Sequence, residues 1–357
     1  MTSTAESTRR EAYVRRMTDS TNGAFDVATA YLGLRLGLYR SLADDGPATP
    51  AELAGRTGLN ERLVREWLEQ QAATEVLEAT RDGPTWRFAL PDEHAAVLLD
   101  PEALDGMGGT ILAQVASVAI APRLLEVFRT GDGIPFAGYD TDMIEGQGAS
   151  TRPVYATELA TWFAAIPDIS ARLASEAGRV LDIGCGMGWS SVTMARIFPN
   201  ARVDGVDLDT ASIEAARANA EGEGVADRVT FEVRDASTLA GAGYDVALMF
   251  EMLHDLSHPV EALQSARAAL APGGAVLVAD EITSDEFSGP ADEADRRHYG
   301  WSVLHCLPAS MTDRDSAATG TVIRPATVRA YAERAGFSWV EILPVESAAF
   351  RLYLLRP

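Results

Sequence analysis

The stretch that most constrains this chain runs from Arg179 to Phe198 and reads RVLDI-GCGMG-WSSVTMARIF. Its first part is a short apolar run typical of a buried strand, and its last part has apolar residues at helical spacing. Three glycines at alternate positions between them allow a tight turn and a close approach of the backbone to a ligand. Strand, turn and helix together predict the nucleotide-binding corner of a doubly wound α/β sheet.

Two carboxylates indicate which ligand this corner binds. Asp207 ends the next predicted strand, residues 201–207, and lies 19 positions after Gly188, where an acid reaches a ribose hydroxyl. Asp182 directly precedes the glycines, which run G-x-G-x-G and not G-x-G-x-x-G as in dinucleotide sites. A carboxylate there repels a pyrophosphate but suits a ligand with an ammonium and a sulfonium group. The predicted cofactor is S-adenosylmethionine.

Residues 179–280 resemble the core of a class I S-adenosylmethionine-dependent methyltransferase. The run V-L-D-I-G-C-G-M-G, the G-V-D at 205–207, the R-D-A at 234–236 and the L-A-P-G-G at 270–274 follow the order of that family. The resemblance implies a seven-stranded Rossmann-like sheet with an antiparallel last strand, and an acid, Asp235, at the adenine amino group. Leu208 is expected on the adenine face, with packing in the core as an equal alternative. The predicted cofactor-binding residues are Asp182, Gly184, Cys185, Gly186, Asp207, Leu208, Asp235, Ala236 and Phe250.

Residues 21–100 have the pattern of a winged helix. Apolar residues at helical spacing predict a helix over 23–42, and Thr49-Pro50-Ala51-Glu52 is a capping box that starts a second one, which stops at Gly58. A further helix over 60–72 completes a helix-turn-helix. Asp82-Gly83, between the runs 76–80 and 85–90, predicts a hairpin.

Charge argues against nucleic acid as the partner of this winged helix. The predicted helix over 60–72 has Arg62 and Arg65 but three glutamates, and the chain has a net charge of −22. Phosphate contacts supply most of the affinity for nucleic acid and need cationic side chains. We expect this domain to form a homodimer and to help wall the substrate pocket, as in the two-domain O-methyltransferases of plants and actinobacteria that it resembles. A DNA-binding regulator is the alternative.

The remaining chain is divided by the same patterns. We expect a flexible N-terminus over 1–20, a helical linker and pocket cover over 101–165, and the catalytic domain over 166–357. In the linker, Pro122 is expected to break a helix over 103–128, and a helix over 152–166 to cover the cofactor. Two cysteines and no apolar run long enough to span a membrane predict a cytoplasmic protein without membrane contact.

The segment after the fourth predicted strand, residues 244–250, carries the candidate base. A hydroxyl acceptor with a pKa of about 10 is mostly protonated at neutral pH, so transfer to it needs a base, usually histidine. His254 is predicted to be this base, with Asp255 as its orienting carboxylate. The stretch resembles the L-H-D-W of plant-type O-methyltransferases, whose histidine accepts the proton, although Leu256 replaces the tryptophan. The alternative is that His254 caps the following helix, a role expected for His258.

The acceptor pocket is predicted to include Tyr155, Trp162, Trp301 and His305. His298, Trp301 and His305 share one helical face, which lines a pocket or simply packs in the core. His305 is also a second candidate for the base. Five scattered histidines with no His/Cys/acid cluster at ligand spacing predict no metal site.

These features predict methyl transfer to a hydroxyl of a small secondary metabolite. Transfer to carbon or nitrogen stays open, as does a relative that binds the cofactor without transferring its methyl group.

Overall fold

The computed structural model describes residues 2–239 and 243–357, with side chains from residue 8 onward. The chain divides into two compact units, with the boundary between Val115 and Ala116. Each unit has a hydrophobic core of its own.

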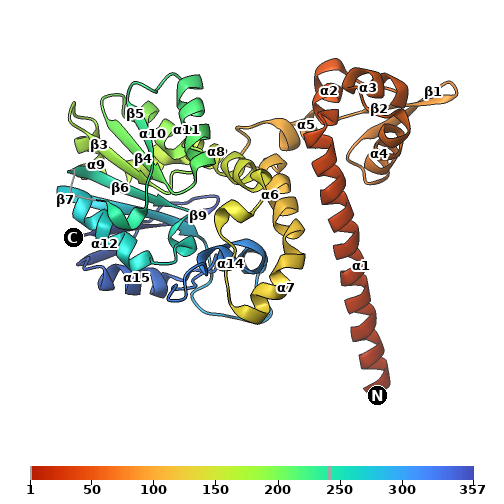
Figure 1. Ribbon diagram of the computed structural model, residues 1–357. Helices are drawn as coiled ribbons and strands as arrows, with labels where there is room; N and C mark the ends of the chain where they lie inside the picture. Colours follow the sequence, from red (N-terminus) through yellow and green to blue (C-terminus); the bar gives the residue numbers. More distant parts are fainter. Residues whose placement is uncertain (1, 240–242) are drawn as a thin grey trace. The chain divides into compact units, whose positions relative to one another are not determined.

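The first unit is a helix-turn-helix followed by a hairpin, as the sequence predicts (Figure 1). Thr49 and Glu52 form the capping box of the second short helix, which ends at the left-handed Gly58. The hairpin closes with Asp82 opposite Thr85. Its elements are α1 (Thr2–Arg35), α2 (Leu38–Asp45), α3 (Pro50–Thr57), α4 (Glu61–Ala73), β1 (Glu78–Asp82), β2 (Thr85–Ala89) and α5 (Asp92–Leu99).

The first helix begins much earlier than expected. Where we expected a flexible segment over residues 1–20 and a helix from Gly23, α1 starts at Thr2. Residues 8–22 are exposed, and few apolar residues recur among them at the helical spacing on which the prediction relied. Residues 2–22 contain neither glycine nor proline, and the hydroxyls of Thr18 and Ser20 donate to carbonyls one turn earlier.

The second unit is an α/β fold. Helices α6 (Gly108–Ala119) and α7 (Ala121–Thr130) lead into it. Its other helices are η1 (Phe136–Gly138), α8 (Thr141–Ala164), α9 (Pro167–Leu173), α10 (Trp189–Ile197), α11 (Thr210–Gly222), η2 (Ala236–Thr238), η3 (Leu253–Asp255), α12 (Pro259–Ala269), α13 (Glu293–Trp301), the π-helix η4 (Ser302–Cys306), α14 (Leu307–Ser310) and α15 (Pro325–Arg334). Its strands are β3 (Arg179–Ile183), β4 (Arg202–Asp207), β5 (Val229–Val233), β6 (Tyr244–Phe250), β7 (Leu270–Glu281), β8 (Trp339–Ile342) and β9 (Phe350–Arg356).

The seven strands form one sheet in the order β5-β4-β3-β6-β7-β9-β8. Strands β3 to β7 pair in parallel, and β9 pairs antiparallel with both β7 and β8. The predicted antiparallel last strand is therefore confirmed. The chain order reverses between β3 and β6, and ligands of such sheets bind beyond the carboxyl ends of the strands at this point.

Alternation along the strands gives the sheet two apolar faces. In β6, Val246, Leu248 and Phe250 join a core that includes α8, α9, α10 and α11. Ala247 and Met249, between them, join a second core that includes α12 and α15. Figure 1 shows these two groups of helices on opposite sides of the sheet. Helices on both faces explain why β6 is buried at every position.

Of the two prolines expected at helix boundaries in the linker, only Pro122 lies at one. It is in the first turn of α7, which is bent by 55° from α6. Among the described residues no single helix has the length and apolar character to cross a membrane, and α6 and α7 meet such a test only as a bent pair. Pro153, in contrast, lies inside α8, which starts at Thr141 and not near 152. Asp140 caps this start by accepting from the amide of Asp142.

Gly188, at the start of α10, offers a test of the glycine turn. It has φ of 78°, and an added Cβ would lie 2.7 Å from the Phe231 ring and 2.9 Å from the Ala216 Cβ. Gly188→Ala should therefore lower the free energy of unfolding by about 2–4 kcal/mol in a urea titration, from backbone strain and overpacking. Gly222→Ala, where nothing lies within 4 Å, is the matched control and should leave it unchanged or higher. Equal effects of the two changes would contradict this account.

Candidate active site

A cavity of about 500 Å³ lies at the carboxyl ends of the strands in the second unit. One part of its wall follows β3, β4 and β5, at residues 183–190, 206–212 and 234–237, and we call it the glycine side. The other part, which we call the acceptor wall, comes from residues 135–137, from α8, from 250–258 after β6 and from 309–313. The cavity thus lies where the reversal of strand order predicts a ligand.

The glycine turn is tied to the neighbouring strand. Gly184 and Gly186 have φ of 68° and 50°, in the left-handed region that favours glycine. The amides of Gly184 and Cys185 donate to the Val206 carbonyl, and the Gly186 amide donates to Asp207 Oδ2 at 2.9 Å. Burial raises the pKa of Asp207. Asp207 therefore fixes the turn and also lies on the cavity wall.

Asp182 lies behind this wall and does not line the cavity. It is buried, and its Oδ2 accepts from the hydroxyls of Ser190 and Ser191 at 2.6 and 2.5 Å. Burial raises the pKa of Asp182 from 3.8 to about 6, although the two serines lower it. The carboxylate thus joins the end of β3 to the start of α10 and holds the turn from beneath. This position differs from the predicted direct contact with the cofactor.

The other residues predicted for the cofactor lie on the glycine side or beside it. Leu208 is 66% exposed on the cavity wall, so the alternative of core packing is wrong. Asp235 accepts from the Ser237 amide at 2.7 Å and lines the cavity with Ala236. Phe250 and Cys185 also lie on the wall. The sequence reasoning missed Met187, Trp189, Ser190, Ser212 and Arg234, which adjoin predicted positions.

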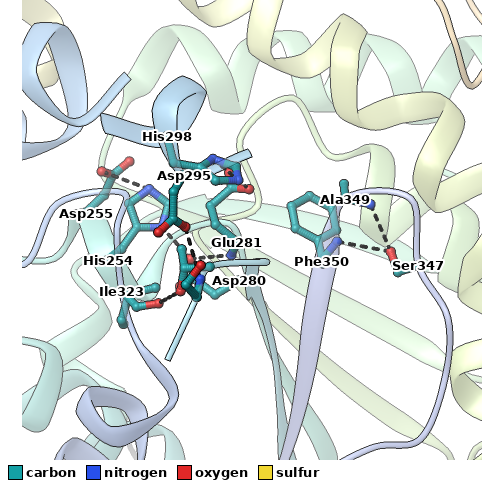
Figure 2. A network of polar contacts seen from close by, with 12 residues as sticks. His254, Asp255, Asp280, Glu281, Asp295, His298, Ile323, Ser347, Ala349 and Phe350 are labelled. Atoms are coloured by element: carbon teal, nitrogen blue, oxygen red, sulfur yellow. Dashed lines mark hydrogen bonds and ion pairs between the residues drawn. The ribbon is translucent and has the colours of Figure 1, made fainter. Parts of the chain in front are cut away.

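His254 is held between two carboxylates, as Figure 2 shows. It lies in η3, is buried, and its Nδ1 is 2.6 Å from Asp280 Oδ1 in β7. Its Nε2 is 3.3 Å from Asp255 Oδ1. His254 itself does not line the cavity, whereas Asp255 does. The sequence reasoning missed Asp280, which makes the shorter contact, because a carboxylate 26 residues away gives no local signal.

These carboxylates control the protonation of His254. Burial by itself lowers the pKa of His254, but Asp255 and Asp280 raise it, and the result lies well above the ordinary value of 6.5. The imidazole therefore has one nitrogen fixed by Asp280 and the other directed toward a carboxylate at the cavity. This arrangement can accept and hold a proton.

Further carboxylates adjoin this pair at the ends of β6 and β7. Glu251 lies on the cavity wall, and burial and then Glu281 raise its pKa well above the ordinary value. Burial also raises the pKa of Glu281 to about 7. His298 Nδ1 lies 3.6 Å from Glu281 (Figure 2), and burial lowers the pKa of His298.

Three donor groups meet at His254 in a way that the sequence did not predict. The ligand atoms of His254, Asp255 and Cys306 lie within 4.8 Å of one another. The sequence has no such cluster at ligand spacing, and the prediction that the chain has no metal site stays a prediction. Cys306 ends the π-helix η4, some fifty positions after His254 in the chain, so no spacing rule brings them together.

Only one of the four residues predicted for the acceptor, Tyr155, lines the cavity among the described residues. Trp162 is fully buried, two turns further along α8, where it packs edge-on against Phe250 with ring centroids 5.6 Å apart. Trp301 is half-buried away from the wall. His305 is buried, and its ring centroid lies 5.7 Å from that of Phe136 and 4.5 Å from that of Tyr139. This agrees with the alternative that it packs in the core.

We expected the side chain of His258 to cap α12, but it makes no capping hydrogen bond. It occupies the cap position, but its Nε2 lies 3.1 Å from Asp313 Oδ2. Both residues line the cavity. The missed acceptor-wall residues Phe136, Gln147, Glu251 and Met252 come from segments whose proximity only the fold reveals.

Comparison with known proteins adds a family to this geometry. Residues 174–324 match the methyltransferase-domain family, and residues 26–99 match the Rv2258c-like winged HTH domain. The 3-hydroxy-5-methyl-1-naphthoate 3-O-methyltransferase of Streptomyces sahachiroi is 30% identical over 78% of this chain and 80% of its own length. The 27-O-demethylrifamycin SV methyltransferase of Amycolatopsis mediterranei is 29% identical over 50% of this chain and 70% of its own length.

Solved structures share the fold over nearly the whole chain. The mitomycin 7-O-methyltransferase superposes with a TM-score of 0.72 at 22% identity, covering 98% of this chain and 100% of that one. Human N-acetylserotonin methyltransferase, solved with S-adenosylmethionine, gives 0.70 at 16% identity, covering 96% and 97%.

The buried Asp182 carboxylate should make stability depend on pH. Because its pKa is higher in the folded chain than the unfolded 3.8, its stabilising contribution is present below pH 3.8 and is lost as pH rises through about 6. The difference corresponds to about 3 kcal/mol. Asp182→Asn removes the buried charge, so its free energy of unfolding should rise relative to the original protein between pH 4 and pH 7, by up to that amount. Denaturant titrations at both pH values measure it.

The exposed Asp285 provides the matched control for this change. Asp285→Asn should show no such dependence on pH. If Asp182→Asn gave the same difference in stability at both pH values, the account of a buried, charged clamp would be wrong.

Proposed function

This chain belongs to the S-adenosylmethionine-dependent methyltransferases that carry an N-terminal winged-helix domain, and from this premise we propose that it methylates a hydroxyl group of a small secondary metabolite. The observation that carries the proposal is the contact between His254 and Asp255. Asp255 lies on the wall of the cavity that the glycine turn also lines. The two relatives named above support it, because their names give a hydroxylated naphthoate and 27-O-demethylrifamycin SV as the molecules that they methylate.

The residues of the glycine side fit the cofactor. The left-handed Gly184 and Gly186 leave the backbone open to close approach, and Asp207 presents a carboxylate where a ribose would lie. Leu208 and Ala236 supply apolar surface for an adenine ring, with Asp235 beside them. When bound, S-adenosylmethionine supplies an electrophilic methyl group on a sulfonium.

The acceptor hydroxyl is proposed to lose its proton to His254 by way of Asp255. Asp255 lines the cavity and accepts the hydrogen bond of the hydroxyl, and His254 Nε2, 3.3 Å behind it, takes up the proton. Asp280 holds Nδ1 and stabilises the imidazolium that forms. A metal ion on His254, Asp255 and Cys306 would occupy the same Nε2, so this role requires the three donors to be free of metal.

We infer that the winged helix does not bind DNA. In α4, the helix that would enter the groove, Arg62 pairs with Glu66 and Arg65 pairs with Glu61 at 2.8 Å. Both arginines are thus partnered within their own helix and offer little charge to a phosphate. We retain a cytoplasmic location as a prediction, supported by Cys185 and Cys306 being free thiols.

Exposed apolar side chains on α1 support a homodimer. Tyr13, Val14, Met17, Phe25 and Leu32 are 43–69% exposed. Light scattering should give twice the 38.1 kDa of one chain, and Phe25→Asp should lower this mass toward the monomer, because a charge on a buried interface is unfavourable. Phe287→Asp, at an equally exposed phenylalanine in the second unit, is the control and should leave the mass unchanged. A monomeric starting protein would refute the proposal.

His254→Gln tests the base. Methyl transfer should fall roughly 100- to 10,000-fold, because a general base contributes that much, while the affinity for S-adenosylhomocysteine stays the same. Turnover is measured with labelled cofactor and mass spectrometry of the product, which also separates transfer to oxygen from transfer to carbon or nitrogen. His94→Gln, in the first unit, is the matched control and should keep full activity.

The pH dependence of turnover follows from the pKa of His254. Because the carboxylates raise this pKa, the imidazole keeps its proton to a higher pH and becomes a base only after losing it. The rate should therefore rise with pH through an apparent pKa above 6.5, and Asp280→Asn should move this rise to lower pH. A profile that His254→Gln leaves unaltered would exclude the assignment.

A further inference from the structure

The acceptor wall has an excess of negative charge. Besides Tyr155, its ionisable residues are Glu251, Asp255, His258 and Asp313, and no arginine lines it among the residues that the structure describes. His258, the only basic side chain there, is already paired with Asp313. Asp255 lies 3.3 Å from His254 Nε2 behind the wall, whereas no cationic residue of the wall is paired with Glu251. An acceptor that fits this wall has to be compatible with two carboxylates.

Glu251 differs from the other acids of the wall in its backbone. It follows β6 directly, its amide donates to the Ala279 carbonyl at 2.8 Å, and its φ is 52°. A residue other than glycine in this left-handed region is strained, and such strain persists where the surroundings or a function hold it. Here the strain places a glutamate at the cavity.

The Glu251 carboxylate lacks a partner. No hydrogen bond or ion pair of this side chain occurs among the described residues, and its atoms are not sealed in the core but face the cavity. A half-buried carboxylate without a partner is costly, and a ligand that brings a positive charge recovers this cost. Glu251 therefore favours a cationic ligand in the cavity.

The charges behind Glu251 strengthen this preference. Asp280 and Glu281 follow Ala279 in the neighbouring strand, which pairs with the end of β6. Together with Asp255 they raise the pKa of Glu251 through their negative charge, whereas His254 lowers it. A positive charge in the cavity would lower this raised pKa and favour the carboxylate form of Glu251.

We propose that Glu251 recognises a positive charge on the acceptor, so that the substrate is a hydroxylated metabolite with a protonated amine, or an equally cationic group, near the methylated hydroxyl. This inference rests on the proposed function and adds the substrate class. It sets the chain apart from its naphthoate-methylating relative, whose acceptor carries a carboxylate. The alternative is that Glu251 interacts with the sulfonium of the cofactor, and the experiment below distinguishes this from recognition of the acceptor.

Three probes with the same phenol and different charge test the inference. 3-Hydroxybenzylamine is cationic at pH 7.5, 3-hydroxybenzyl alcohol is neutral and 3-hydroxybenzoate is anionic. Calorimetry on the full chain saturated with S-adenosylhomocysteine should show the amine binding about ten- to hundredfold more tightly than the alcohol, as expected for a charge-assisted hydrogen bond, and the benzoate weakest. Glu251→Gln should abolish the advantage of the amine without weakening the alcohol. Glu261→Gln, at an exposed position on α12, should retain it.

Two other results would overturn the inference. One is equal or weaker binding of the amine, including no detectable binding. The other is that Glu251→Gln weakens S-adenosylmethionine but not S-adenosylhomocysteine, which would assign the carboxylate to the sulfonium. The proposed function fails separately, if the original protein transfers no methyl group from labelled cofactor to any hydroxylated acceptor.

Discussion

The hydrogen bonds of Asp182 with Ser190 and Ser191 are the interaction on which the site depends. They join the end of the strand β3 to the first residues of the helix α10, and so they hold the glycine turn between them in place. With the turn fixed, the Gly186 amide reaches Asp207, and two neighbouring strands present their ends as one surface. A buried carboxylate is costly to keep charged, and the hydrogen bonds from Ser190 and Ser191 that offset this cost also fix the geometry of the binding surface.

The base and the acids around it depend on a second constraint, the parallel pairing of β6 with β7. Because Phe250 lies opposite Ala279, the residues that follow these two positions in the chain lie side by side. Asp280 then meets the His254 imidazole, and Glu251 and Glu281 adjoin it. The electrostatics of this region thus follow from strand register, because desolvation and mutual repulsion act on whichever groups the sheet brings together.

Local patterns predicted most of the fold, and the glycine side followed from them. The capping box at Thr49 and the hairpin turn at Asp82 are each encoded within a few residues, which is why their positions agree with the structure. The seven-stranded sheet with its antiparallel last strand was implied by the resemblance to the methyltransferase family. The first part of α1, residues 2–22, escaped prediction because few apolar residues recur there at helical spacing. Asp280, Cys306 and the acceptor wall escaped it for another reason: they meet only through tertiary packing, and Trp162 shows that an aromatic residue near a site can belong to the core.

The end of β6 also bears on how enzymes of this architecture diversify. Its strand is buried on both faces and tolerates little change, whereas the residue just beyond it, Glu251, contributes to the cavity and not to the apolar core. A substitution there alters charge at the acceptor without disturbing the packing beneath. Related enzymes can therefore acquire new acceptors by changes at strand tips while keeping the donor site intact.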